Sequence, residues 1–154
     1  DSFDKVDQNP HTTTAQEGAD FAKANGCDVV VAIGGGRYHG LCKSDCILSK
    51  MMGISTITSI IACVADALPL VLIPTTCGTG SEGNGFAVLT NPDNGDKKSL
   101  RCNAIVAKVS IVDPECMMTM PKKVLASVTF DALCHNIEAY TSKIAQPLTD
   151  ALSL

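Results

Sequence analysis

Two side chains that could hold a metal ion lie four residues apart near the carboxyl end of the chain. Asp131 and His135 belong to the run Asp-Ala-Leu-Cys-His, whose flanks favour a helix as far as Gln146 and Pro147. Residues at this spacing project from one face of a helix, one above the other. A carboxylate and an imidazole placed in this way could bind one divalent ion. Surface pairs and helix-start carboxylates share the spacing, so the pair needs support from the rest of the chain.

Two loops of small residues could bind a nucleotide. Each follows an apolar run, at 28–33 and 70–74, that is typical of a strand buried in a parallel sheet. The first run ends in three glycines, which let the backbone approach a pyrophosphate, and the second enters a loop rich in hydroxyls. Ligands bind at this edge of an open α/β sheet, although tight strand exits and ordinary Ser/Thr-rich loops look similar. The predicted cofactor contacts are Gly35, Gly36, Thr75, Thr76, Thr79 and Ser81.

The remaining pattern predicts an α/β region followed by helices. We expect a helix over 15–24, capped by Thr12–Thr14 and closed by Asn25-Gly26, a β-hairpin with strands 86–90 and 97–100, a third core strand at 107–112, and helices from Pro121 onward. The predicted domains are therefore an incomplete α/β dinucleotide-binding domain at 1–116 and the beginning of a helical metal-binding domain at 117–154.

Composition narrows the function classes. The 154 residues are 45% hydrophobic and 18% charged, with a net charge of −4, which suits a soluble domain with a real core. No basic patch suggests nucleic acid, and the longest apolar region is too interrupted for a membrane span. The eight cysteines include no Cys-x-x-Cys pair, so we expect buried free thiols in a reducing cytoplasm rather than a disulfide framework.

Four motifs, in order, carry a resemblance to a known family. They are Val29–Gly36, Ile73–Glu82, Asp113-Pro114 and Phe130–Tyr140. Together they resemble the iron-containing (group III) alcohol dehydrogenases, over nearly the whole chain. The resemblance implies a dehydroquinate-synthase-like fold, of which this chain would be a middle fragment, truncated at both ends.

The resemblance also implies a chemistry. In the family, iron acts as a Lewis acid that lowers the pKa of an alcohol, so that hydride passes to NAD or NADP. Asp131 and His135 match two of the four metal ligands, and the other two are histidines further along the family's helical domain, so the chain as given should be inactive. Lys97, which by itself would be a solvated turn charge, matches a lysine that reaches the cofactor. Glu138 is expected to be an exposed helix carboxylate.

Several alternatives stay open at this stage. The chain could be a catalytically dead nucleotide-binding remnant, or a relative of zinc glycerol dehydrogenase or dehydroquinate synthase. Zn²⁺ in place of Fe²⁺, NADP in place of NAD, the identity of the alcohol or aldehyde, and a homo-oligomeric parent protein are not decided by these residues.

One segment departs from the family pattern. After Gly36 the family has Ser-x-x-Asp-x-Ala-Lys opening a helix, whereas Arg37 and Gly40 stand at the serine and aspartate positions. One set of permitted codons for residues 37–46, with a single base removed, reads Ser-Ile-Met-Asp-Cys-Ala-Lys-Ala-Ile, which restores the motif. Residues 51–59, read in the third frame, give a polar linker. We therefore hypothesise frame slips within 37–63 and expect this segment to lack a regular helix and to pack poorly.

Overall fold

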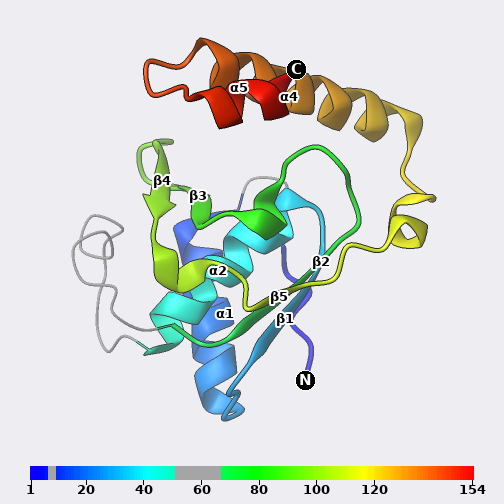
Figure 1. Ribbon diagram of the computed structural model, residues 1–154. Coiled ribbons are helices and arrows are strands. Elements are labelled where there is room, and N and C mark those ends of the chain that lie inside the picture. The colour runs from blue at the N-terminus through cyan, green and yellow to red at the C-terminus, as the bar shows by residue number, and fades with distance from the viewer. Residues whose placement is uncertain (7–9, 51–66) are drawn as a thin grey trace.

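The computed structural model describes residues 1–6, 10–50 and 67–154 (Figure 1). The helices are α1 (Thr12–Ala24), α2 (Gly36–Lys50), α4 (Lys122–Thr141) and α5 (Pro147–Ser153); the strands are β1 (Val30–Gly34), β2 (Leu70–Pro74), β3 (Phe86–Thr90), β4 (Lys97–Arg101) and β5 (Val109–Ser110); and the short 3-10 helices are η1 (Ser81–Gly83), η2 (Asn103–Ile105) and η3 (Pro114–Met117).

The centre of the α/β part is a parallel sheet in the order β1-β2-β5. Ala32 and Leu72 pair in register and are buried under the helices, with Leu70 and Leu68 in the same apolar cluster. The opposite face is exposed, because Val31 and Val109 are each about half accessible. The sheet therefore has one packed face, and its parallel strands deliver their carboxyl ends to a common edge.

The helix α2 corrects the expectation for residues 37–63. It begins at Gly36, directly after the glycine loop, and is buried almost without interruption from His39 to Leu48. It packs against α1, the parallel sheet and β3, so it has no solvent-facing stripe to give its sequence a helical period. The expected absence of a helix is wrong as far as Lys50, and the expected poor packing is wrong as far as Leu48. Residues 51–63 lie outside the residues that the structure describes.

Buried polar groups are the unusual feature of α2. His39, Lys43, Ser44 and Asp45 are all buried among the apolar residues Leu41, Cys46, Ile47 and Leu48. Ser44 satisfies its hydroxyl locally, donating to the carbonyl of Gly40 at 3.0 Å. Such positions erase the apolar pattern on which helix prediction depends, which explains why the helix was missed.

The predicted hairpin is confirmed. β3 and β4 pair antiparallel, with Ala87 opposite Leu100, and both residues enter the core cluster shared by α1 and α2. β5 differs from expectation, because it is only two residues long and both are exposed rather than core. The cap of α1 also differs: His11 is the N-cap residue, and the three threonines lie inside the helix.

The helices α4 and α5 follow the α/β part and lie together across the edge where β1 and β2 end (Figure 1). Neither helix contains a buried residue, and Phe130, Leu133 and Ile137 of α4 are more than half exposed. The start of a helical region after the parallel sheet agrees with the predicted order of elements.

The cysteines bear on the predicted redox state. All seven cysteines in the described part of the chain are free, as expected, but only Cys46 is fully buried, and Cys77 and Cys116 are exposed. The expectation of buried thiols is therefore wrong for most of them. None of the described helices combines the length and apolarity needed to cross a lipid bilayer.

Candidate functional site

A cleft of about 1280 Å³ lies between the carboxyl edge of the parallel sheet and the helix α4. Its walls come from the glycine loop, the loop after β2, the hairpin and α4. Of the residues predicted to form the site, the cleft is lined by Gly35, Gly36, Thr76, Thr79, Ser81, Lys97, Asp131 and His135. The structure thus brings the two predicted sets, one for a cofactor and one for a metal, onto a single cavity.

The glycine loop forms the cleft wall at the start of α2. A Cβ on Gly35 would lie 3.2 Å from the side chain of Thr76, and a Cβ on Gly36 would lie 3.1 Å from Thr79. The glycines therefore let the two loops pack closely. The first amides of a helix lack partners within the helix and favour anions, so this wall is suited to a phosphate group.

The loop after β2 connects the α/β part to α4. Gly78 has φ 140°, and a Cβ there would collide with the backbone carbonyl of Val128 on α4. Thr75 is not among the cleft-lining residues; its amide donates to the carbonyl of Gly34 at 3.0 Å and so ties the two loops together. Only glycine fits position 78 without strain, because L side chains disfavour this φ.

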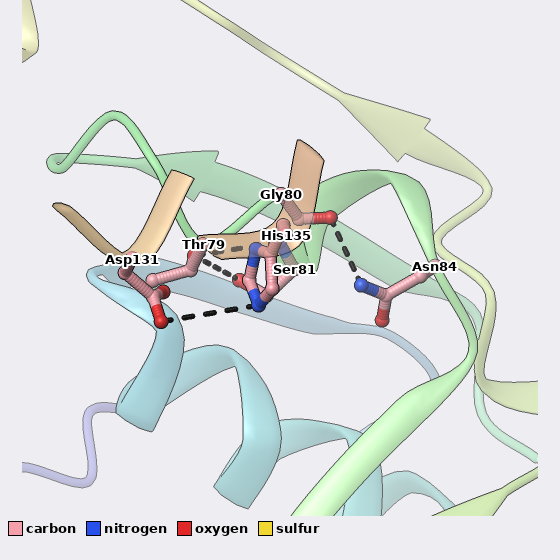
Figure 2. A network of polar contacts seen from close by, with 6 residues as sticks. All are labelled: Thr79, Gly80, Ser81, Asn84, Asp131 and His135. Atoms are coloured by element: carbon pink, nitrogen blue, oxygen red, sulfur yellow. Dashed lines mark hydrogen bonds and ion pairs between the residues drawn. The ribbon is translucent and has the colours of Figure 1, made fainter. Parts of the chain in front are cut away.

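Ser81 is held from two sides. Its hydroxyl accepts a hydrogen bond from Thr79 Oγ1 at 3.2 Å and pairs with His39 Nδ1 at 2.7 Å. Its carbonyl accepts from Lys43 Nζ at 2.6 Å. Figure 2 draws the Thr79–Ser81 contact and the Asp131–His135 pair in one view, together with the hydrogen bond that Asn84 Nδ2 donates to the carbonyl of Gly80. Both hydroxyls are thus fixed in direction before any ligand binds.

Burial shifts the pKa of the groups behind this loop. It lowers the pKa of His39, although the Glu82 carboxylate opposes the shift. It also lowers the pKa of the Lys43 ammonium to about 8, again against Glu82. Burial raises the pKa of Asp45, on the same helix, to about 8. The helix therefore carries several titratable groups whose charged forms are disfavoured by desolvation.

Asp131 and His135 lie on the cleft side of α4. Asp131 Oδ1 is 3.9 Å from His135 Nε2, and the two side chains are 47% and 52% exposed. Donor atoms that each lie about 2.1 Å from a shared ion are at most about 4.2 Å apart, so this pair fits one divalent ion. No third His, Cys, Asp or Glu joins them among the residues that the structure describes. The pair therefore supplies part of a ligand set.

Other residues that line the cleft were not predicted as site residues. Arg37 and Tyr38 reach the cleft from the first turn of α2, and Val124 and Ser127 reach it from α4. Glu138 is exposed, as expected, but also lines the cleft. Lys43 and His39 act behind the wall and were missed because their partners are more than thirty residues away in sequence.

A parallel sheet with a glycine loop at a helix start, facing a helical region across a cleft, is the architecture of a nucleotide-binding α/β protein. A family model described as iron-containing alcohol dehydrogenase matches residues 1–114. The chain belongs to the iron-containing alcohol dehydrogenase family.

Individual relatives agree with this assignment. The chain is 37% identical over 153 residues to a protein of Bacillus methanolicus named NAD-dependent methanol dehydrogenase, covering 99% of this chain and 40% of the relative. It superposes on a crystal structure of 1,3-propanediol oxidoreductase with a TM-score of 0.90 and 34% identity, over 98% of this chain and 40% of that one. A sulfoacetaldehyde reductase from Bifidobacterium kashiwanohense, solved in complex with NAD+, gives a TM-score of 0.87 and 32% identity, over 98% and 41% of the two chains. The chain thus spans about 40% of the length of these relatives.

Proposed function

We propose that the protein represented by this chain is an NAD-dependent, iron-containing alcohol dehydrogenase that transfers hydride between a small alcohol and the nicotinamide. Family membership and the NAD-dependent relative support this choice. The alternatives of zinc glycerol dehydrogenase and dehydroquinate synthase receive no comparable support. The described cysteines are free thiols, which supports a reducing compartment, the cytoplasm.

The main observation behind this proposal is that one cleft is lined by both predicted metal ligands and by every predicted cofactor contact except Thr75. We assign the pyrophosphate to the first turn of α2, beside Gly35 and Gly36, where helix amides favour an anion. Thr79 and Ser81, held together by their hydrogen bond, line the adjacent wall. Lys97 approaches from β4 and adds a positive charge to a site for an anionic ligand.

The metal is assigned to the α4 side of the same cleft. Asp131 and His135 would supply a carboxylate and an imidazole to the ion. When bound, the ion would supply a Lewis acid for the substrate oxygen. Both residues line the same cleft as Gly36 and Thr79, which supports the binding of the substrate oxygen and the cofactor next to each other.

The test is NADH binding to the purified chain, followed by nicotinamide fluorescence. Thr79→Val and Lys97→Met should each weaken binding by roughly twofold to tenfold, as the loss of one polar contact implies. Lys98→Met is the matched control, because Lys98 is the neighbouring exposed lysine of β4 but does not line the cleft. Equal affinity in all four proteins, or no binding by the unmodified chain, would refute the cofactor assignment.

A further inference from the structure

Ser81 and His39 form a hydroxyl–imidazole pair at the wall of the cleft. Ser81 Oγ lies 2.7 Å from His39 Nδ1, which is the distance of a good hydrogen bond. Ser81 lines the cleft, whereas His39 is completely buried behind it. A hydroxyl that faces a cavity and contacts a basic nitrogen is the arrangement that activates a serine as a nucleophile.

The neighbouring groups determine where the protons of this pair lie. Thr79 Oγ1 donates to Ser81 Oγ at 3.2 Å (Figure 2), so the Ser81 hydroxyl keeps its own proton for His39. The carbonyl of Ile73 acts on the imidazole as an acceptor, and because Nδ1 faces Ser81, we place the proton of the neutral ring on Nε2. Nε2 makes no hydrogen bond of standard geometry within the described part of the chain, so this contact orients the ring only weakly. Nδ1 is then available to accept the Ser81 proton.

Burial keeps the imidazole in its basic form. The pKa of His39 is lowered chiefly by burial and to a smaller extent by Lys43 on the same helix, while Glu82 of η1 and the carbonyl of Ile73 oppose the shift. Because the charged form is disfavoured, the ring is mostly neutral at pH 7. The neutral imidazole is the form that acts as a general base.

We propose that Ser81 is a nucleophile that accepts an acyl group from small activated esters, with His39 as its general base. Ser81 Oγ attacks the ester carbonyl carbon and forms the new C–O bond, while its proton passes to His39 Nδ1. The bond to the leaving group then breaks, and the leaving oxygen takes the proton from Nδ1. The products are acyl-Ser81 and the free alcohol. Arg37 and Lys97 line the same cleft, and their charges favour the negative oxygen of the tetrahedral adduct.

This acyl transfer needs neither a metal ion nor a nucleotide, so it is independent of the proposed hydride transfer. The test is incubation of the purified chain with p-nitrophenyl acetate, in which the release of p-nitrophenolate and the identity of the acetylated peptide are measured. The acetyl group should lie on Ser81, and Ser81→Ala should lose it. His39→Asn keeps a polar group beside Ser81 but removes the base, so the rate should fall by roughly a hundredfold or more.

The pH profile is a second measurement on the unmodified chain. The rate at Ser81 should be nearly constant from about pH 7 to about pH 8.5 and should fall in acid, because the lowered pKa keeps His39 neutral over that range. Ser99→Ala is the matched control, since Ser99 is a second serine of the same cleft and makes no hydrogen bond to a histidine among the described residues. It should react as the unmodified chain does.

Three results would overturn the proposal. The first is acetyl groups found only on lysines, on the amino terminus or on Ser99. The second is an equal rate at Ser81 in His39→Asn. The third is a rate that keeps rising about tenfold per pH unit, as an unassisted hydroxyl far below its own pKa requires. If His39→Asn fails to fold, the pH profile of the unmodified chain decides alone.

Discussion

Gly78 lies directly against the backbone carbonyl of Val128, so closely that a Cβ on residue 78 would collide with it. This contact joins the loop after β2, in the α/β part, to the helix α4 that carries Asp131 and His135. The cleft depends on this junction, because its two predicted residue sets lie on opposite sides of it.

Substitution at Gly78 should therefore open the cleft. Gly78→Ala combines an unfavourable φ with the collision and should destabilise the native arrangement by about 1–3 kcal/mol. The measurement is urea unfolding together with hydrogen exchange in 122–141. Gly83→Ala is the control, since a Cβ there meets nothing within 4 Å, and it should change stability by less than about 0.5 kcal/mol. Equal effects of the two substitutions would contradict the role of the junction.

A second prediction follows from ligand counting at Asp131 and His135. Two protein ligands leave a divalent ion largely hydrated, whereas catalytic sites usually have three or more. The chain should therefore neither retain Fe²⁺ through anaerobic desalting nor produce NAD(P)H from primary alcohols. Asp131→Ala and His135→Ala are the controls. Turnover above the metal-free blank that disappears in both variants would show that this pair suffices.

A third prediction concerns Asp45 and pH. Because burial raises its pKa to about 8, the folded chain binds one proton more than the unfolded chain between pH 4 and 8. The Asp45 contribution to stability is therefore full below about pH 4 and is lost as pH rises towards 8, by about 1.4 kcal/mol per pH unit. The measurement is the difference in unfolding free energy between the chain and Asp45→Asn from pH 5 to 7.5. This difference separates the contribution of Asp45 from those of His39 and Lys43, which both proteins share. A difference that does not change with pH would refute it.

The reading-frame hypothesis gives a fourth prediction. The helix α2 is present, contrary to expectation. The alternative frame would place methionine at position 39, alanine at 44 and isoleucine at 45, and would keep lysine at 43. Three of the four buried polar residues would thus become apolar, and Lys43, which has four oxygen partners, would stay. Burying an apolar side chain in place of a carboxyl favours folding. Asp45→Ile should therefore raise the urea midpoint, and an unchanged or lower midpoint would count against the hypothesis.

The direct test is the nucleotide sequence across codons 36–64. Short insertions relative to an intact relative, three bases net, are expected. Resequencing that returns the present frame without base ambiguity would end the hypothesis.

The sequence predicted those parts of the fold that local pattern encodes. The strand Leu70–Pro74 was predicted with its observed bounds, and the turn at 91–96 identified the hairpin. The family of the chain followed from motifs such as Ile73–Glu82, because a motif of this kind is carried by consecutive residues and is recognisable without the fold. The helix α2 was missed since enclosure on all sides removes the periodicity that prediction needs.

The candidate site was only partly predictable, because some of its residues belong to local motifs and others depend on contacts between distant parts of the chain. Gly36, Thr79 and Asp131 carry recognisable local motifs, and the structure places all three on the cleft. Lys43 stands at the lysine of the family pattern Ser-x-x-Asp-x-Ala-Lys, but its burial has no local signal, because an isolated lysine in a helix usually lies in solvent. Its partners are defined only when β3 folds against α2. Thr75 was predicted as a cofactor contact from its loop alone. In the structure it does not line the cleft, and its backbone amide donates to the carbonyl of Gly34.

The bare face of the parallel sheet has a practical consequence. Val31, Ile33 and Val109 form a row of half-exposed apolar side chains, and β1 and β5 both end the sheet with unpaired edges in the part of the chain that the structure describes. Flat apolar surface beside open strand edges promotes self-association. The chain should therefore be poorly soluble at high concentration and should precipitate in kosmotropic salts, which strengthen apolar burial. Binding experiments are best made at low protein concentration, with light scattering recorded alongside.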